Sequence, residues 1–185
     1  MNINVLGRFS LAQDLKYCLV GDGHCVQHVS NLDSIRNLVC YIPYMNNKTR
    51  CNLYKKAKQN GAIITSYVSS KSTVCDNVEL GDGTIIFPNC YVGSNVRIGS
   101  NCIIMPNCVI SHDCVIEDNC YIAPSVTLGG FVQVGVNSTL YLSSSVIPST
   151  VIGSDVTVGM GAVVINNCAN DHTYVGNPAT PIRKG

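Results

Sequence analysis

The sequence predicts a mainly β protein in which a small α/β domain precedes a triangular solenoid of short parallel strands. Three observations lead to this prediction. Aliphatic residues recur at every sixth position from Val68 to Val164, small and corner-forming residues recur in fixed places between them, and residues 1–67 lack this pattern. Because a fixed short period is typical of a solenoid, we expect an α/β domain over residues 1–67 and a solenoid domain over residues 68–185.

Strand-like and helix-like segments alternate before the repeat, which is typical of a small parallel α/β domain. A helix is predicted at residues 48–60, because Asn46 or Asn47 can cap its start and Gly61 follows its end. The basic residues of this helix are interpreted as a solvent-exposed face; they are Lys48, Arg50, Lys55, Lys56 and Lys58. Strands are predicted at residues 3–6, 16–20, 37–42 and 62–68.

The solenoid is predicted from 17 consecutive aliphatic positions, spaced by six residues without an insertion. A small residue stands four positions after each of them, and Asn, Asp or Gly is frequent three positions after. Asn, Asp and Gly tolerate a left-handed backbone, so we expect a tight corner every six residues. Three hexads would then close one coil, so that residues 18 apart stack on one another.

The composition of the chain argues against nucleic-acid and membrane partners. The chain of 185 residues has 12 Lys and Arg against 11 Asp and Glu, a formal net charge of +1. Nucleic-acid binding normally needs a clustered basic surface, so we expect no nucleic-acid partner. No stretch approaches the roughly 18 apolar residues of a membrane span, and the N-terminus lacks the pattern of a signal peptide. We therefore expect a cytoplasmic protein with no membrane partner.

The 11 cysteines are the unusual feature of the composition. No pair has the CxxC spacing of zinc ribbons and redox motifs, and we expect no metal. The β-carbons of cysteines stacked in adjacent coils would lie near 4.8 Å apart, outside the usual range of roughly 3.5–4.5 Å for a disulfide, so reduced thiols are predicted. Six cysteines take the small inward position of their hexads, where they are expected to pack as compact apolar side chains: Cys90, Cys102, Cys108, Cys114, Cys120 and Cys168.

Two segments and the hexads together resemble a known family. The hexads look like the left-handed β-helix of hexapeptide-repeat acyltransferases, and residues 175–179, Val-Gly-Asn-Pro-Ala, followed by Ile182 and Arg183, are similar to its closing segment. Residues 110–116, Ile-Ser-His-Asp-Cys-Val-Ile, resemble the active-site stretch of one branch. That branch comprises sialic-acid O-acetyltransferases and nucleotide-amino-sugar N-acetyltransferases of bacillosamine and related pathways.

The resemblance implies a left-handed parallel β-helix preceded by a small, reduced Rossmann-like α/β domain. It also implies a homotrimer that binds acetyl-CoA between neighbouring helices. His112 would be the general base of a direct acetyl transfer, and Asp113 would raise its basicity. A backbone N–H near Gly130 would support the oxyanion. Gly130 is also 18 residues after His112, so it should stack over the base. The alternatives are that His112 is a corner histidine without a role and that Asp113 is an ordinary left-handed corner.

Other residues of the expected site depart from the family pattern. Tyr121 stands where the branch has a second histidine that helps to hold the acetyl-CoA thioester, and it is either a hydrogen-bond donor there or an exposed solenoid side chain. Leu142 and Met160 match positions whose backbone lines the coenzyme groove.

The residues expected to bind the nucleotide-sugar differ most from the family pattern. Gly7 and Ser10 follow the first strand, where the family has a glycine-rich turn. With a strand expected from residue 16, the first helix would be drastically shortened. Asp22, placed after the second strand, is either a contact to the nucleotide-sugar or part of a loop turn. Met45 stands where the family has a glycine near the nucleotide, and Asn46 follows it.

The leading hypothesis is acetyl-CoA-dependent N-acetylation of a nucleotide-linked amino sugar of the UDP-4-amino-4,6-dideoxyhexose type. The alternatives are O-acetylation of a sugar or sialic acid, and a catalytically inactive β-helix that acts in binding or assembly. A zinc carbonic anhydrase needs three converging histidines, and His112 is the only one within the complete hexads. An ice-binding solenoid would display Thr-x-Thr ladders, which the sequence lacks.

Overall fold

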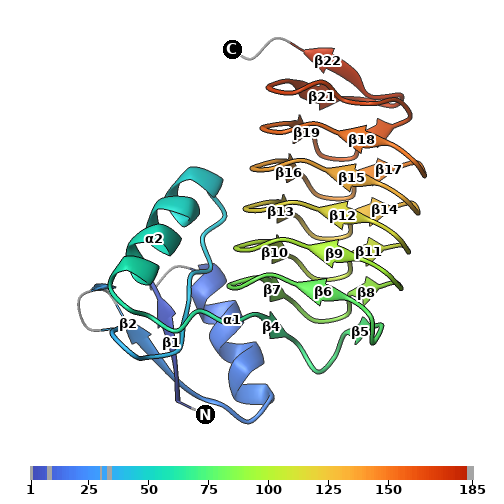
Figure 1. Cartoon of the computed structure of the whole chain (residues 1–185). Helices are drawn as coiled ribbons and strands as arrows, with labels where there is room; N and C mark the ends of the chain where they lie inside the picture. The colour runs from blue at the N-terminus through green and yellow to red at the C-terminus, as the bar shows by residue number, and fades with distance from the viewer. Residues whose placement is uncertain (1, 8–9, 30, 33–34, 183–185) are drawn as a thin grey trace.

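A computed structural model describes residues 2–182 except residues 8–9, 30 and 33–34. It consists of a small α/β segment that packs against the first coils of a tall triangular prism (Figure 1). The family resemblance also involves residues 8–9, in the turn after the first strand, and Arg183. These residues lie outside the described ranges. No helix in the described ranges is long and apolar enough to cross a membrane.

The α/β segment is built on three parallel strands in the order β2-β1-β3. The central strand β1 (Asn2–Leu6) pairs with β2 (Cys25–Val29) on one side and with β3 (Cys40–Tyr41) on the other. Helix α1 (Ser10–Gly21) follows β1, and helix α2 (Asn47–Gln59) follows β3. The parallel α/β class is therefore confirmed.

The prediction of a strand at 16–20 and of a shortened first helix is wrong, because these residues belong to α1. Leu11, Leu15 and Leu19 are spaced by four residues, and all three are buried on one face of the helix. Strand β2 was not predicted at all. The strands expected at 37–42 and 62–68 form only in part, as β3 and β4 (Tyr67–Val68), with a single bridge between Val39 and Ile63.

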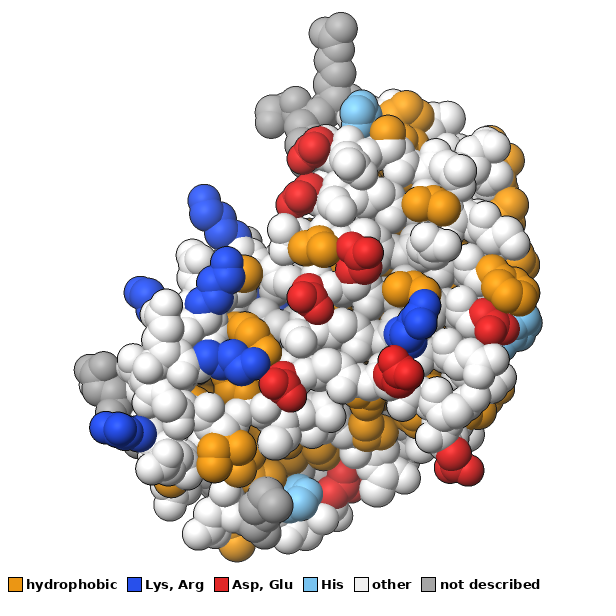
Figure 2. Space-filling view, in the orientation of Figure 1, with side chains coloured by type: hydrophobic (Ala, Val, Ile, Leu, Met, Phe, Trp, Pro, Cys, Tyr) orange, Lys and Arg blue, Asp and Glu red, His pale blue; other side chains and the backbone are white. Residues whose placement is uncertain are grey.

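The predicted second helix is confirmed, with its cap. The Asn46 side chain accepts a hydrogen bond from the Thr49 N–H at 2.9 Å, and Gly61 takes φ +78° just beyond the C-terminal end. The exposed basic face is correct for Lys48, Lys55, Lys56 and Lys58, whose side of the molecule is rich in Lys and Arg in Figure 2. It is wrong for Arg50, which is fully buried.

The repeat forms 17 two-residue strands, each of which ends on one of the predicted aliphatic residues. Two further strands, β21 (Thr173–Val175) and β22 (Thr180–Ile182), close the top of the prism. The repeat strands after β4 are β5 (Thr73–Val74), β6 (Glu79–Leu80), β7 (Ile85–Ile86), β8 (Tyr91–Val92), β9 (Arg97–Ile98), β10 (Ile103–Ile104), β11 (Val109–Ile110), β12 (Val115–Ile116), β13 (Tyr121–Ile122), β14 (Thr127–Leu128), β15 (Gln133–Val134), β16 (Thr139–Leu140), β17 (Ser145–Val146), β18 (Val151–Ile152), β19 (Thr157–Val158) and β20 (Val163–Val164).

The strands stack as three sheets, one on each face of the prism, and all neighbours are parallel except the closing pair β21 and β22, which is antiparallel. Face 1 contains β4, β7, β10, β13, β16, β19 and the two closing strands; face 2 runs from β5 to β20; face 3 runs from β6 to β18. Within the repeat, paired residues are 18 apart, as Ile110 and Leu128 are. The predicted left-handed parallel β-helix of hexapeptide repeats is thus the observed fold.

The corners adopt the left-handed backbone that their residue types predict. Thirteen of the 14 non-glycine residues with positive φ in the described ranges are Asn, Asp or Ser, and Asp113 is among them with φ +57°. Asn77 is a predicted corner that is absent from this group. Phe131, with φ +61°, is the only large side chain in it.

The inward cysteines form part of the solenoid core, as predicted, and all are free thiols. They also donate weak hydrogen bonds across the coil. The Cys108 thiol reaches the Ala123 carbonyl at 3.1 Å, and the Cys114 thiol reaches the Gly129 carbonyl at 3.1 Å. Thr84 and Ser138 make the same contact with their hydroxyls. A small side chain with a hydrogen-bond donor at this position therefore both fills the core and satisfies a backbone carbonyl across the coil.

The α/β segment docks on face 1 through a shared apolar cluster. Leu15 and Tyr41 pack there with Phe87, Ile103 and Tyr121 of the solenoid. This contact places α2 beside the corner between faces 3 and 1, where Arg50 bonds to Asn101 and Asn119.

Candidate active site

His112 and Asp113 lie at the corner between faces 2 and 3, between strands β11 and β12. The left-handed conformation of Asp113 turns the chain sharply at this point. The side chains of both residues remain accessible, at 55% and 32% exposure respectively. A histidine in this place is therefore open to a ligand from outside the prism.

The His112 Nδ1 lies 2.8 Å from Asp113 Oδ2. A carboxylate can only accept, so Nδ1 carries the proton and Nε2 keeps a free lone pair in the neutral ring. The hydrogen bond from His112 is the main cause of the low pKa of the Asp113 carboxyl, which lies below its ordinary value. Asp113 thus stays ionised and holds the imidazole in the tautomer that a general base needs.

A ladder of asparagine side chains supports Asp113 from the coils below. The Asn95 amide donates to Asp113 Oδ1 at 3.0 Å, and the Asn77 amide donates to Asn95 Oδ1 at 2.5 Å. One carboxylate oxygen therefore faces Asn95 while the other faces His112. Asn95 was not among the residues predicted for the site, although its position 18 residues before Asp113 is a signal that could have identified it.

Gly130 stacks over His112, as the 18-residue spacing predicts. A β-carbon on Gly130 would lie 2.7 Å from Cε1 and 2.8 Å from Nε2 of the imidazole. Nε2 is therefore beside the glycine, and the Gly130 N–H makes no hydrogen bond within the described ranges. The candidate base thus lies against a residue whose backbone donor is free among the described residues.

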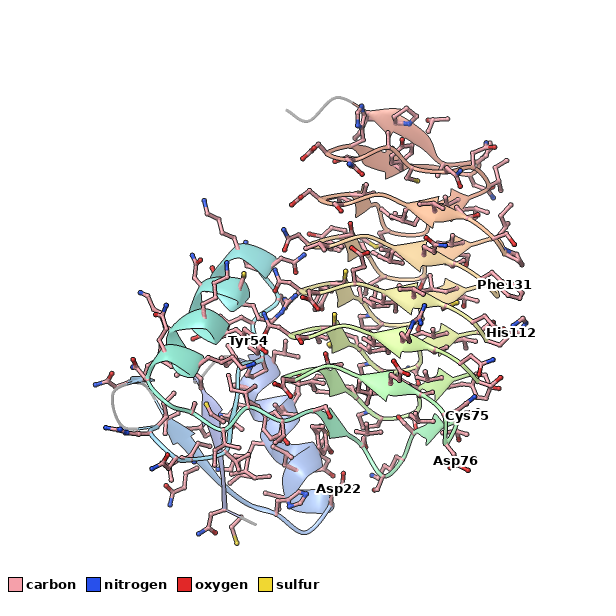
Figure 3. The ribbon with its side chains drawn as sticks, viewed as in Figure 1. Asp22, Tyr54, Cys75, Asp76, His112 and Phe131 are labelled. Atoms are coloured by element: carbon pink, nitrogen blue, oxygen red, sulfur yellow. The ribbon has the colours of Figure 1, made fainter. Side chains whose placement is uncertain are left out.

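Phe131 is a second residue of this corner that was not predicted for the site. Its ring meets the His112 imidazole edge to face, with centroids 5.1 Å apart and an interplanar angle of 88°. Figure 3 shows the two side chains together at the outer edge of the prism.

A separate pocket of about 350 Å³ lies where α2 meets face 1. Two residues predicted for the substrate, Met45 and Asn46, line it together with Tyr121, which was predicted for the coenzyme. Tyr121 is only 3% exposed, so the alternative of an exposed solenoid side chain is wrong. Burial raises the pKa of its hydroxyl. The remaining lining residues are Asn47, Lys48, Thr139 and Tyr141.

Arg50 holds this pocket in place. Its guanidinium donates to the carbonyls of Asn101 and Asn119 in the solenoid and to those of Tyr44 and Met45 in the segment before α2. Burial lowers its pKa to about 10. The sequence carried no signal for this role, because Arg50 is one of five basic residues on a helix whose other four are exposed.

Gly7 directly follows β1 and Ser10 begins α1, at the carboxyl edge of the parallel sheet. Gly7 adopts φ +98° and donates its N–H to Val29, and its carbonyl lies 2.9 Å from His28 Nδ1. Ligands of open parallel sheets bind at the carboxyl ends of the strands. The segment before α2, with Met45, leaves the same edge of the sheet.

Asp22 does not lie at that edge, so its predicted place after the second strand is wrong. It follows α1 and precedes β2, and it receives hydrogen bonds from the Tyr67 hydroxyl at 2.6 Å and from the Ser70 hydroxyl at 2.5 Å. These bonds tie the end of α1 to the first coil of the solenoid.

Leu142 and Met160 lie at the third corner, between faces 1 and 2. They stack in adjacent coils and are 42% and 73% exposed. The candidate residues of one chain therefore occupy three different edges of the prism; Figure 3 shows His112 on the edge opposite to α2, which carries Tyr54. Within the described ranges, no three His, Cys, Asp or Glu side chains gather in a metal-binding group.

Comparisons with known proteins agree with this architecture. A family model described as "Bacterial transferase hexapeptide (six repeats)" matches residues 77–112 and 95–130. The solved structure of a histidine-to-alanine mutant of GDP-perosamine N-acetyl transferase from Caulobacter crescentus, in complex with CoA and GDP-perosamine, is 23% identical. It matches with a TM-score of 0.92, and the match covers 100% of this chain and 98% of that chain.

Two further structures have the same fold over nearly their whole length. The acetyltransferase domain of PglB from Neisseria gonorrhoeae, in complex with acetyl coenzyme A, is 20% identical, with a TM-score of 0.94 and 98% of each chain covered. WeeI from Acinetobacter baumannii is 22% identical, with a TM-score of 0.90 and coverage of 98% of this chain and 100% of that chain.

Proposed function

We propose that this chain, a hexapeptide-repeat protein with the left-handed β-helix fold of known sugar acetyltransferases, transfers an acetyl group from acetyl-CoA to an amine of a nucleotide-linked amino sugar. The acceptor is of the UDP-4-amino-4,6-dideoxyhexose type. The observation that carries the proposal is the corner where His112, paired with Asp113, adjoins Gly130, whose N–H is unbonded in the described part of the chain.

The chemistry assigned to these residues is a direct transfer. As the acceptor amine attacks the thioester carbonyl, a C–N bond forms, and His112 Nε2 takes the proton that the nitrogen must lose. The Gly130 N–H donates to the carbonyl oxygen as negative charge develops there. Collapse of the tetrahedral intermediate breaks the C–S bond and releases the thiolate of coenzyme A. Asp113 stabilises the imidazolium that forms during the reaction.

The acceptor is proposed to bind with its nucleotide on the α/β segment. The pocket at the start of α2 offers the positive end of a helix together with Lys48, an arrangement that favours an anionic diphosphate. Gly7 and Ser10 line the same edge of the sheet, and Met45 and Asn46 line the pocket itself.

A complete site is proposed to form between protomers of a cytoplasmic homotrimer. The support is that His112 and the α2 pocket lie on different edges of one prism, so a neighbouring chain is needed to bring them together. Leu142 and Met160 would line the coenzyme groove at the third edge. Mixed oligomers of His112→Ala and Tyr141→Ala chains should then recover activity that neither variant has alone, whereas a site within one chain would show no recovery.

Release of coenzyme A in the presence of UDP-4-amino sugars tests the function directly. His112→Ala should lower kcat by roughly 10²–10⁴-fold, because it removes a general base. His172→Ala is the matched control, since His172 is an exposed histidine in the last coil and should be replaceable without loss. Turnover of a hydroxyl acceptor instead of the amine would favour O-acetylation. Absence of acetyl-CoA binding in calorimetry would favour an inactive binding module and would overturn the proposal.

A further inference from the structure

Phe131 lies at the corner of the candidate base and differs in residue type from the other left-handed corners. It lies one coil above Asp113, in line with Asn77 and Asn95, and it has φ +61°. The other non-glycine residues with positive φ in the described ranges are Asn, Asp or Ser. A bulky side chain in this conformation is a genuine outlier, because its β-carbon crowds the following carbonyl.

The fold itself does not require this residue. An asparagine at position 131 would suit the left-handed backbone, and in the coils below an asparagine at this corner bonds to the side chain stacked above it. Phe131 does not contribute to the core either, because it is 54% exposed. Strained positions of this kind concentrate at functional sites, where binding or chemistry compensates for their cost.

The position of the ring indicates what it faces. Phe131 meets the imidazole of His112 edge to face at 5.1 Å, so it stands beside the atoms that would receive the acceptor proton. A substrate whose amine reaches His112 therefore places the neighbouring substituents of its ring close to the phenyl group. In a 4-amino-hexopyranose, the carbon next to the one that bears the amine carries C6, which is a methyl in a 6-deoxy sugar and a hydroxymethyl otherwise.

We infer that Phe131 is a specificity-determining residue that selects an acceptor with an apolar C6 group beside its reacting amine. This inference rests on the proposed function and goes beyond it by assigning the selection to one side chain. Aliphatic C–H groups pack favourably on an aromatic ring, whereas a hydroxyl held against it loses its water without gaining a partner. Apolar sites of this kind discriminate against an added hydroxyl by up to about 10²-fold.

The test compares two acceptors with the same nucleotide, a 4-amino-4,6-dideoxyhexose and the corresponding 4-amino-4-deoxyhexose with a 6-hydroxyl. The wild type should prefer the deoxy sugar by about 10–100-fold in kcat/KM. Phe131→Asn should reduce this preference to less than about threefold, mainly through KM for the deoxy sugar. Phe131→Tyr should keep it, because the aromatic face remains.

Thermal melting provides a readout that does not depend on activity. Phe131→Asn should raise the melting temperature by about 2–4 °C, because it relieves the left-handed strain. Phe131→Leu loses the flat ring but keeps the strain, so its preference should fall without a gain in stability. Asp171→Asn, at a left-handed corner of the last coil, is the control that should change neither quantity.

The outcomes separate the two proposals. If the wild type acetylates neither sugar, the proposed function fails, and this inference fails with it. If the wild type is active but Phe131→Asn keeps its preference, or loses kcat equally for both sugars, the inference alone is overturned. An equal loss of kcat for both sugars would show that Phe131 only holds His112 in place. A fall in melting temperature for Phe131→Asn would also contradict the strain on which the inference is built.

Discussion

The α-carbon of Gly130 lies against the imidazole of His112, one coil above it, so closely that a β-carbon would stand 2.7 Å from Cε1. Every coil stacks residues 18 apart, yet here the stack brings a residue without a side chain onto the candidate base. The absence of a β-carbon leaves room for Nε2 beside the backbone of Gly130. This geometry leads to the first prediction.

Gly130→Ala should displace the imidazole and lower kcat/KM by about 10²–10³-fold, because the added methyl group moves the base out of line with the backbone N–H, which the alanine retains. The fold should survive, because the side chain would press on an accessible histidine and not on the core. Gly21→Ala is the control, since a β-carbon there meets nothing within 4 Å. Turnover of Gly130→Ala at the wild-type rate in the coenzyme A release assay would contradict the assigned role.

The contact between Asp113 and His112 predicts losses of activity that become smaller with distance from the base, from Asp113 through Asn95 to Asn77. Asp113→Asn should lower kcat/KM on the order of 10²-fold, because it removes the charge that stabilises the imidazolium. Asn95→Ser should have a smaller effect of about tenfold, since a serine suits the left-handed corner but is too short to reach Asp113. Asn77→Ser, one rung further away, should be nearly neutral. Equal losses for the three variants would argue against a ladder that acts through Asp113.

Arg50→Met should destabilise the protein by about 3 kcal/mol or more, because several buried carbonyls would lose their donor. Urea unfolding measures this effect. Lys55→Met, an exposed position on the same helix, is the control and should change stability little. Arg50→Lys should also be destabilising, since an ammonium lacks the planar fork of the guanidinium. Wild-type stability of Arg50→Met would show that the α2 pocket does not depend on this side chain.

The hydrogen bonds of Asp22 predict that the stability of the folded protein decreases as the pH is lowered in the acid range. Partial burial raises the pKa of its carboxyl, but the hydrogen bonds from Ser70 and Tyr67 outweigh this effect and leave the pKa below its ordinary value of 3.8. A carboxyl with a depressed pKa stabilises the fold above its unfolded pKa, and this contribution is lost as the pH falls through the folded pKa. The melting temperature of the wild type should therefore drop more steeply than that of Asp22→Asn as the pH is lowered from 5 to 2. Parallel curves would show that Asp22 does not help to dock α1.

Much of the solenoid could be predicted because its determinants are local and repeated. Each hexad carries its own aliphatic residue, small residue and corner, so the 18-residue stack follows from counting, and it places Gly130 over His112 without any structure. The α/β segment offered no such repetition. Residues 16–20 resemble a strand when considered alone, and they are helical because Leu19 is buried together with Leu11 and Leu15 on one face of α1.

The sequence by itself determined the coiled fold, the corner that carries His112 and Asp113, and the inward thiols, because these depend on neighbours at fixed sequence distances. Tertiary structure decided the rest. The burial of Arg50, the pocket that Tyr121 shares with Met45, and the docking role of Asp22 all arise where the α/β segment meets face 1. Such contacts join residues 45 to 76 positions apart, and no periodic pattern in the sequence encodes which of them will meet.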